Sequence, residues 1–342
     1  MSLNLHATLW PSFPHFDFFA NDKRLAGIRL NSAMIDNAEL EIELAKIKSN
    51  PPLNPLWFDI KGRQLRITDV HLNPDYLDIT INHRISVPTP VPVLFKAGAD
   101  GALLDRVEED GRRLIFSGGP EFMVKTGESL HIRHPEFQVL DDTDGMFTDI
   151  EKQKIEQVRK FGFTRYYLSY VYSQRYVDEF RELVGLDAEV RLKIEDVAGL
   201  RYVAREFLKN DNITLVAARG DLYVEVSRPH HILQALRLII AKDPKASVGS
   251  RILLSTVQPS MAKIKRALNY VEEHNPDDHK TAEIISYLME PQPPSCADFL
   301  DLAWLYDIGY RDMMLCDELC LKGDLLQSAV NTFEGFRRYY ER

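Results

Sequence analysis

Charged side chains end several apolar stretches of this sequence, at points where a buried strand would otherwise continue. Lys193 and Glu195 stand two residues apart at the end of "VRLKIED", and Asp221 ends the next stretch, "ITLVAARGD". Because residues i and i+2 of a strand point to the same side, Lys193 and Glu195 are expected to share a face. Two carboxylates on adjacent strands could bind one hard divalent cation, with water or substrate oxygens completing an octahedron. The alternative is a set of salt bridges, since buried charges must either pair or bind a ligand.

The same kind of ending recurs along the chain. Two more stretches end in polar residues spaced by two, and two others end in a hydroxyl or a carboxylate. These residues are Arg29 with Asn31, Asp59 with Lys61, Thr256, and Glu318. They would form one site only if the fold brought the ends of all these stretches together.

Short apolar runs alternate with stretches of helical period over most of the chain, which favours a parallel sheet built from βα units. Eight such units predict an α/β fold, a (β/α)8 TIM barrel. The strands are expected at 6–11, 26–31, 56–60, 165–171, 190–196, 213–221, 251–257 and 312–318. In a barrel of this kind the carboxyl ends of the strands form the active-site face, so the polar residues should converge there.

Residues 69–140 interrupt this rhythm. They contain short alternating runs such as "YLDITINH", bounded by Pro and Gly turns, which is typical of an all-β module. We therefore expect a small all-β domain at 69–140, inserted after strand 3, with the barrel in 1–68 and 141–342. His131 and His134 lie where this insert returns to the barrel and could reach the site, but we expect them to have structural roles.

Composition excludes several classes of protein. The chain has 342 residues, of which 45% are hydrophobic, and a net charge of −9, which disfavours a nucleic-acid partner. No apolar run approaches the ~20 residues of a membrane span, and the N-terminus lacks the pattern of a signal peptide. Three cysteines are too few for a disulfide framework. A cytoplasmic protein without a nucleic-acid or membrane partner is therefore predicted.

Several segments, taken in order, resemble the pyruvate kinase family. The most specific are "LKIEDVAGL" and "LVAARGDLYVEV", which are similar to a Lys-Ile-Glu strand end followed by Ala-Arg-Gly-Asp-Leu. "AGIRLNSA", "FDIKGRQLR" and "LLSTVQPSM" are similar to the family's Ala-Arg-Leu-Asn, Asp-Thr-Lys-Gly-Pro-Glu-Ile-Arg and Ala-Thr-Gln-Met-Leu segments. Residues 300–330 follow its last βα unit. The resemblance runs from about the first strand to the end of the chain.

The resemblance implies roles for five residues at the strand ends. Glu195 and Asp221 would hold Mg²⁺ or Mn²⁺, and the amides of Gly220 and Asp221 would face the carboxylate of the substrate. Gly220 would allow a sharp turn and close approach of the ligand. Lys193 would lie against the transferring phosphoryl group or the developing enolate charge. Thr256 would help to protonate the methylene carbon.

It also implies further contacts with phosphate and with a monovalent cation. Arg29 and Arg66 match family positions that contact phosphate, and Lys61 is placed with them among the substrate-binding residues. Asn31 and Asp59 match two ligands of the family's K⁺ site. The other two ligands of that site, a Ser and a Thr, are replaced here by Ala33 and Ile60.

The inserted domain is shorter than in the family and lacks its Ile-Asp-Asp-Gly lid motif, which closes over the nucleotide. The family's C-terminal regulatory domain has no counterpart in the sequence. A longer connection at 262–292 could cover part of the site or a dimer face, and a homodimer through the barrel is expected.

Three functions remain open. The first is a divergent pyruvate kinase-like phosphotransferase that acts on phosphoenolpyruvate, pyruvate or a related 2-oxo acid, with ATP or ADP as co-substrate. The second is a metal-dependent aldolase or decarboxylase that needs no nucleotide. The third is a non-catalytic homologue that binds a 2-oxo acid or a partner. The intact Lys193, Glu195, Asp221 and Thr256 argue against the third, and the missing lid motif argues against a complete kinase.

Overall fold

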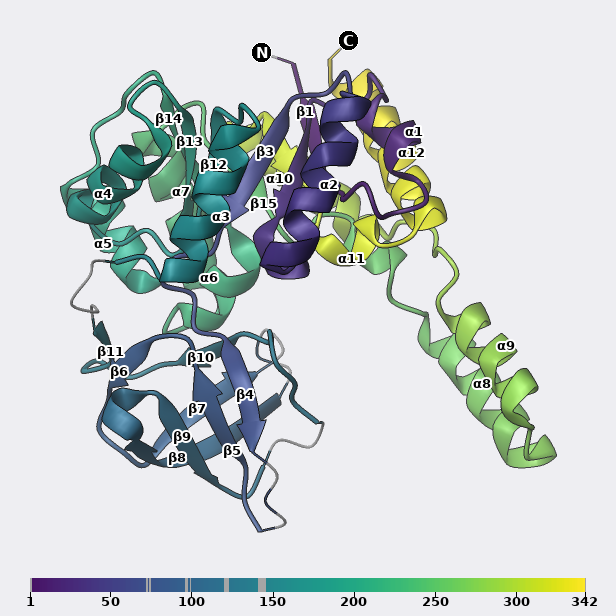
Figure 1. Ribbon diagram of the computed structural model, residues 1–342. Coiled ribbons are helices and arrows are strands. Elements are labelled where there is room, and N and C mark those ends of the chain that lie inside the picture. Colours follow the sequence, from purple (N-terminus) through teal and green to yellow (C-terminus); the bar gives the residue numbers. More distant parts are fainter. Residues whose placement is uncertain are drawn as a thin grey trace. The chain divides into compact units, whose positions relative to one another are not determined.

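A closed barrel of eight strands organises the chain (Figure 1). The computed structural model describes residues 2–71, 73, 75–95, 98, 100–119, 123–140 and 146–341. Around the barrel the strands follow the order β1-β16-β15-β14-β13-β12-β3-β2. Their bounds are β1 (Asn4–Thr8), β2 (Gly27–Asn31), β3 (Leu56–Ile60), β12 (Arg165–Leu168), β13 (Glu189–Ile194), β14 (Ile213–Ala218), β15 (Ser247–Gly249) and β16 (Asp312–Met314). The predicted (β/α)8 TIM barrel is confirmed.

The chain divides into two compact units. Unit 1 comprises Met1–Leu30, Ala45–Trp57 and Pro244–Arg342, and unit 2 comprises Asn31–Leu44 and Phe58–Asp243. Strands β12, β13 and β14, the last three residues of β3 and the inserted β domain belong to unit 2.

Helices follow most of the barrel strands, and side chains cap their first turns. Thr148 accepts a hydrogen bond from the amide of Glu151 in α3 (Asp149–Lys160), and the Glu151 carboxylate accepts one from the amide of Thr148. Asp196 caps α5 (Val197–Arg205) in a similar way. Such caps satisfy amides that have no partner inside the helix. The other described helices are α1 (Phe16–Ala20), α2 (Asn37–Ser49), α4 (Gln174–Val184), α6 (Arg219–Glu225), α7 (His231–Lys242), α8 (Met261–His274), α9 (Asp278–Leu288), α10 (Cys296–Ile308), α11 (Asp317–Cys320) and α12 (Gly323–Tyr340). None of the described helices is long and apolar enough to cross a membrane.

An all-β domain is inserted after β3, as predicted. It contains a six-stranded antiparallel sheet in the order β10-β7-β8-β9-β5-β4 and a two-stranded sheet of β11 and β6. The strands are β4 (Ile67–His71), β5 (Asp78–Ile81), β6 (Arg84–Ser86), β7 (Val91–Phe95), β8 (Asp100–Glu108), β9 (Arg113–Ser117), β10 (Leu130–Ile132) and β11 (Gln138–Leu140). The limits 69–140 remain a prediction.

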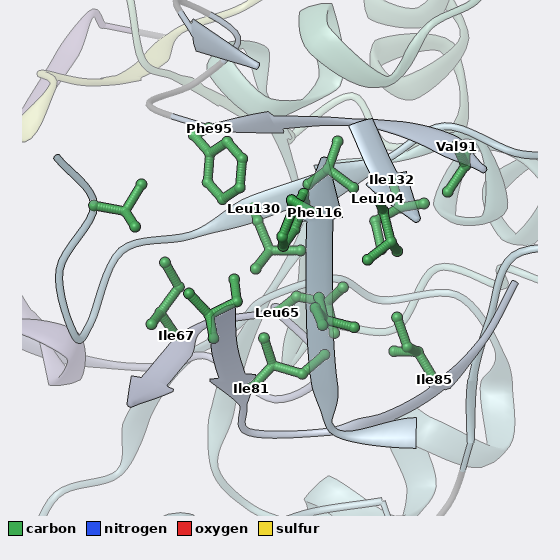
Figure 2. Packing of buried hydrophobic residues seen from close by; sticks show 14 residues of the cluster. Leu65, Ile67, Ile81, Ile85, Val91, Phe95, Leu104, Phe116, Leu130 and Ile132 are labelled. Atoms are coloured by element: carbon green, nitrogen blue, oxygen red, sulfur yellow. The ribbon is translucent and has the colours of Figure 1, made fainter. Parts of the chain in front are cut away.

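The inserted domain has a hydrophobic core of its own (Figure 2). Strand β7 supplies Val91, Val93 and Phe95 to this core, whereas Pro92 between them is exposed. This alternation is the two-residue period of a strand with one buried face. The rings of Phe95 and Phe116 pack with their centroids 5.7 Å apart. The sequence pattern therefore predicted this module because one face of each strand is buried.

The sixth and eighth barrel strands are shorter than predicted. Strand β14 ends at Ala218 and α6 begins at Arg219, so Asp221 lies in the first turn of a helix rather than at a strand end. Glu318 likewise lies in α11 and not at the end of β16. In both places the apolar pattern continued into a helix that packs against the barrel, and periodicity alone does not separate a strand from a short buried helix.

The seventh strand was predicted in the wrong place. Strand β15 covers Ser247–Gly249, and the predicted segment 251–257 forms a loop and a 3-10 helix, η4 (Leu254–Thr256). Arg251 and Leu253 have positive φ angles of 60° and 54°, which no strand contains. The apolar run "ILL" is thus a buried loop, and it carries Thr256 away from the strand end.

Candidate functional site

Two lysines and two carboxylates form a buried charged cluster at the ends of β3 and β13. Lys61 Nζ lies 2.8 Å from Asp59 Oδ2, and Lys193 Nζ lies 2.9 Å from Glu195 Oε1 and 3.5 Å from Asp59 Oδ2. Ser169 joins them, since its hydroxyl accepts from Lys193 Nζ at 2.9 Å and donates to Asp59 Oδ1 at 3.3 Å. All four charged side chains are buried, and Asp59 and Glu195 completely so. The structure therefore brings together two of the three i, i+2 pairs predicted from the sequence, and Arg29 with Asn31 is not among them.

Glu195 is held by a strained backbone segment. The amide of Tyr170 donates to Glu195 Oε2 at 2.6 Å, and Tyr170 has a φ of 50°, in the left-handed region that non-glycine residues rarely adopt. Burial raises the pKa of the Glu195 carboxyl, the charge of Asp221 raises it further, and Lys193 opposes both effects. Oε1 receives no aligned hydrogen bond, although Lys193 Nζ is close, so the contact between them is an ion pair.

A histidine from the inserted domain faces Asp221. His131, on β10, shares a hydrogen bond between Nδ1 and Glu225 Oε1 at 2.8 Å, and its Nε2 lies 3.5 Å from Asp221 Oδ1. Burial acts to lower the pKa of His131, but Glu225 and Asp221 outweigh it and the pKa is raised. The Asp221 side chain is 26% exposed, whereas His131 is buried. His131 therefore makes charged contacts with helix α6, and the sequence analysis gave it only a general structural role.

Arg66 lies near the same carboxylates, but its donors are already engaged. Its Nε and Nη2 donate to Gln64 Oε1 at 3.0 and 2.6 Å, and its Nη1 donates to Gly127 O at 2.5 Å. Burial lowers the pKa of the guanidinium, and the charges of Asp59 and Asp221 oppose this shift. Contact with a phosphate would therefore require Arg66 to exchange these partners.

Arg29 and Thr256 belong to unit 1. Arg29 Nη1 donates to Asp317 Oδ1 at 2.7 Å and to Thr8 Oγ1 at 3.0 Å. Thr256 is completely buried, and its hydroxyl donates to Leu253 O at 2.7 Å. Both side chains thus hold the loops of unit 1 together, and a catalytic role would need them to change partners.

Asn31 and Gly220 have local roles. Asn31 Oδ1 accepts from the amide of Ala33 at 3.1 Å and caps the 3-10 helix η1 (Ser32–Met34). Gly220 lies inside the first turn of α6 and is not among the glycines with positive φ. Gly220 and Asp221 thus lie at the N-terminus of a helix that follows β14 directly, and the substrate-binding role expected of Gly220 stays a prediction.

A cavity of about 410 Å³ lies beside the cluster within unit 2. His131, Tyr170 and Glu225 line it, together with Arg63 and Tyr172. Lys193 and Glu195 are buried behind this wall and do not line the cavity. Its volume falls in the range of small-molecule sites, so a ligand there would contact the cluster through Tyr170 and His131.

The architecture has a counterpart among solved structures. The crystal structure of pyruvate kinase from Pyrobaculum aerophilum superposes with a TM-score of 0.65 at 16% sequence identity, covering 99% of this chain and 73% of that chain. The chain has a pyruvate kinase-like fold. No family model and no curated protein sequence matches it. At this identity the likeness establishes the fold and not the activity.

Sequence reasoning missed two residues that the pyruvate kinase-like fold places in the cluster. Ser169 and Tyr170 follow β12 directly and lie inside the segment predicted as strand up to residue 171. A polar Ser169 within an apolar run was the available signal. Nothing in the sequence indicated the positive φ of Tyr170, whose amide bonds to a residue 25 positions away.

The carboxylates of this cluster are of the chemical type that binds a divalent cation. Glu195 Oε1 is buried without an aligned hydrogen bond, and Asp221 is partly open to solvent. Hard cations prefer such oxygen ligands. Within the described residues, however, no group of three or more His, Cys, Asp and Glu side chains is close enough to hold a metal ion. A cation bound by Glu195 and Asp221 would therefore depend on oxygens from water or from a substrate.

Proposed function

We propose that this chain is a divergent pyruvate kinase-like enzyme that acts on a 2-oxo acid, or on the corresponding enol phosphate, through an enolate. The observation that carries the proposal is the buried Lys193–Glu195 pair, 2.9 Å apart, together with a partly exposed Asp221 whose charge acts on Glu195. Burying a charge costs several kcal/mol, which only good pairing and hydrogen bonding offset, so a buried charged cluster is a candidate for a functional site. The pyruvate kinase-like fold supports this assignment.

Each residue of the site has a proposed task. Glu195 and Asp221 would hold Mg²⁺ or Mn²⁺, and when bound the cation would serve as a Lewis acid toward the oxygens of the substrate. Lys193 carries a positive charge on the same strand face and would oppose the negative charge that develops on the substrate. Ser169 and Asp59 would keep the ammonium aimed into the cluster, since both contact it.

The proposal is tested by exchange of the methyl protons of pyruvate in deuterated water, followed by NMR with Mg²⁺ or Mn²⁺ present. Exchange requires the enolate but no nucleotide. We expect Lys193→Met to exchange ~10²–10³ times more slowly than the wild type, which is the usual cost of removing one preorganised electrostatic group. Exchange at the wild-type rate would make Lys193 a structural counter-ion.

Lys209→Met is the matched control. Lys209 also pairs with a completely buried carboxylate, Asp243, at 3.1 Å, but it contacts the first residue of β14, at the opposite end of that strand from Asp221. Its loss should lower stability and leave the exchange rate per folded molecule unchanged. A similar loss of exchange in both variants would point to unfolding rather than chemistry.

The metal ligands are tested without any substrate. Mn²⁺ binding, followed by electron paramagnetic resonance, should be weakened in Asp221→Asn, because a carboxylate binds a hard cation far better than an amide does. Asp211→Asn, at an exposed position, serves as the control. Equal affinity in the wild type and in Asp221→Asn would remove Asp221 from the site.

A lyase that needs no nucleotide is the second candidate, and the absence of the Ile-Asp-Asp-Gly lid motif from the inserted domain favours it. Calorimetric titration with oxalate, a mimic of the pyruvate enolate, and then with ADP and ATP separates the two candidates. A kinase should bind a nucleotide in the presence of Mg²⁺, whereas a lyase should bind oxalate alone.

A further inference from the structure

Helices α8 and α9 form a hairpin that extends from the part of unit 1 containing α10 and α12 (Figure 1). Its ends are well defined. Ser260 accepts a hydrogen bond from the amide of Lys263 at the start of α8, and Asp277 accepts one from the amide of Lys280 at the start of α9. Asn275 ends α8 with a φ of 41°, in the left-handed conformation common at helix ends. The sequence thus specifies this hairpin locally.

The hairpin buries almost nothing of its own. Both helices lie wholly within the described residues, and Ala267 is their single buried side chain. The contacts between them include two lysines over tyrosine rings: Lys263 Nζ lies 4.4 Å from the ring centroid of Tyr287, and Lys280 Nζ lies 5.7 Å from that of Tyr270. Helices of 14 and 11 residues are marginally stable in water without an apolar face packed against a partner. The hairpin therefore needs a further surface to cover it.

An apolar seam on α8 is available for this. Met261, Leu268 and Val271 are 77%, 56% and 40% exposed, and Ile264 between them is half-buried. Their spacing of three, four and three residues is the heptad spacing of a coiled coil, which places them in one line along the helix. Figure 1 shows no other element of this unit beside the hairpin. The seam is thus the surface that a partner helix would cover.

The charges beside the seam indicate which partner fits. The first half of α8 is basic, with Lys263, Lys265 and Arg266, and its last turn is acidic, with Glu272 and Glu273. Lys265 and Glu272 occupy equivalent heptad positions, one on each side of Leu268. Neither makes an ion pair with another described residue. A second α8 running in the opposite direction would therefore set each basic half against an acidic one.

We propose that the second half of the α8 seam, Leu268 and Val271, is a dimerisation surface on which the α8 helices of two copies of this chain pack antiparallel. Leu268 of one copy packs beside the partner's Val271, and Lys265 then lies next to the partner's Glu272. The two-fold symmetry of the dimer makes each of these contacts occur twice. In a parallel, in-register pairing Lys265 and Glu272 would not meet. This inference does not depend on the proposed activity.

Charge reversal tests both the surface and the direction of packing. By sedimentation velocity over a wide concentration range, the full chain should dimerise. Lys265→Glu and Glu272→Lys should each weaken the dimer on the order of tenfold, because each turns two favourable pairs into like-charge pairs. The double variant should return to the wild-type association, and a mixture of the two single variants should form a heterodimer stronger than either homodimer.

Leu268→Glu should abolish the dimer, since it places a charge inside the seam. The control is Leu208→Glu, which changes an 83% exposed leucine outside the hairpin and should leave the dimer intact. Thermal unfolding of each variant as a monomer checks that the fold is preserved. A wild type that stays monomeric, a dimer that survives Leu268→Glu, or a double reversal that fails to restore association would each overturn the proposal.

Discussion

Removal of Lys193 should destabilise the protein strongly and in a pH-dependent manner. Lys193 Nζ lies 2.9 Å from Glu195 Oε1 and 3.5 Å from Asp59 Oδ2, and both carboxylates are completely buried. At an effective dielectric constant of about 20, the shorter contact is worth about 6 kcal/mol of attraction before desolvation. Much of this offsets the cost of burying the ammonium, so we expect Lys193→Met to lower the free energy of unfolding by about 3–5 kcal/mol at pH 8.

The loss should be smaller at acidic pH. Burial already raises the pKa of Glu195, and removal of Lys193 would raise it further. A group whose pKa is raised on folding binds its proton more tightly in the folded state, so its protonated form favours folding and that stability is lost as pH increases. At a pH below the folded-state pKa of Glu195, Lys193→Met therefore buries a neutral carboxylic acid. The difference in free energy of unfolding between this variant and the wild type is then smaller.

Urea unfolding followed by circular dichroism at pH 5 and pH 8 measures both effects. Lys193→Met/Glu195→Gln should recover most of the loss at pH 8, because no unpaired charge remains. The control is Lys160→Met, which removes an exposed pair with Glu156 at 2.7 Å and should cost less than ~1 kcal/mol. If Lys193→Met has the wild-type unfolding midpoint at pH 8, or if its deficit is the same at both pH values, the reasoning about the buried pair is wrong.

Three further outcomes are expected. Gly62 has a φ of 51°, and a Cβ there would lie 1.5 Å from Tyr176 Oη, so Gly62→Ala should lower the thermal unfolding temperature markedly. The double variant Gly62→Ala/Tyr176→Phe should recover only part of this loss, because the backbone strain at position 62 remains. Burial raises the pKa of Glu151 from 4.5 to about 7. The protonated side chain therefore favours the folded state. This contribution to the free energy of unfolding is complete below about pH 4.5 and decreases by about 3 kcal/mol at most as the pH rises through 7. In urea unfolding, Glu151→Gln should lack this component, and a parallel decline in wild type and variant would contradict the assignment. Deletion of residues 70–139 with rejoined ends should leave a cooperative thermal transition, because the inserted domain has its own hydrophobic core; a broad, non-cooperative transition would show that the barrel needs the insert.

The sequence predicted those parts of the fold and of the site that depend on local patterns. The strand at 56–60 and the alternating faces of the inserted domain follow from short-range periodicity. The pairing of Asp59 with Lys61 and of Lys193 with Glu195 follows from the i, i+2 rule on a strand.

The rest depended on contacts between distant residues. His131 and Glu225 are 94 positions apart, and only the folded chain reveals their hydrogen bond. Thr256 was placed at a strand end because "ILLST" is apolar, whereas the positive φ angles that precede it belong to a loop fixed by its surroundings. Asp221 was placed at a strand end because a buried helix turn and a buried strand share the same composition.

The two ammonium groups that flank Asp59 have a consequence for how the protein responds to its surroundings. A diffusible monovalent ion neutralises a carboxylate only as far as its concentration allows, and it leaves when that concentration falls. Lys61 and Lys193 are attached to the chain, at 2.8 and 3.5 Å from Asp59 Oδ2, so they supply positive charge that cannot dissociate. We therefore expect the charge balance around Asp59 to be the same in sodium as in potassium salts.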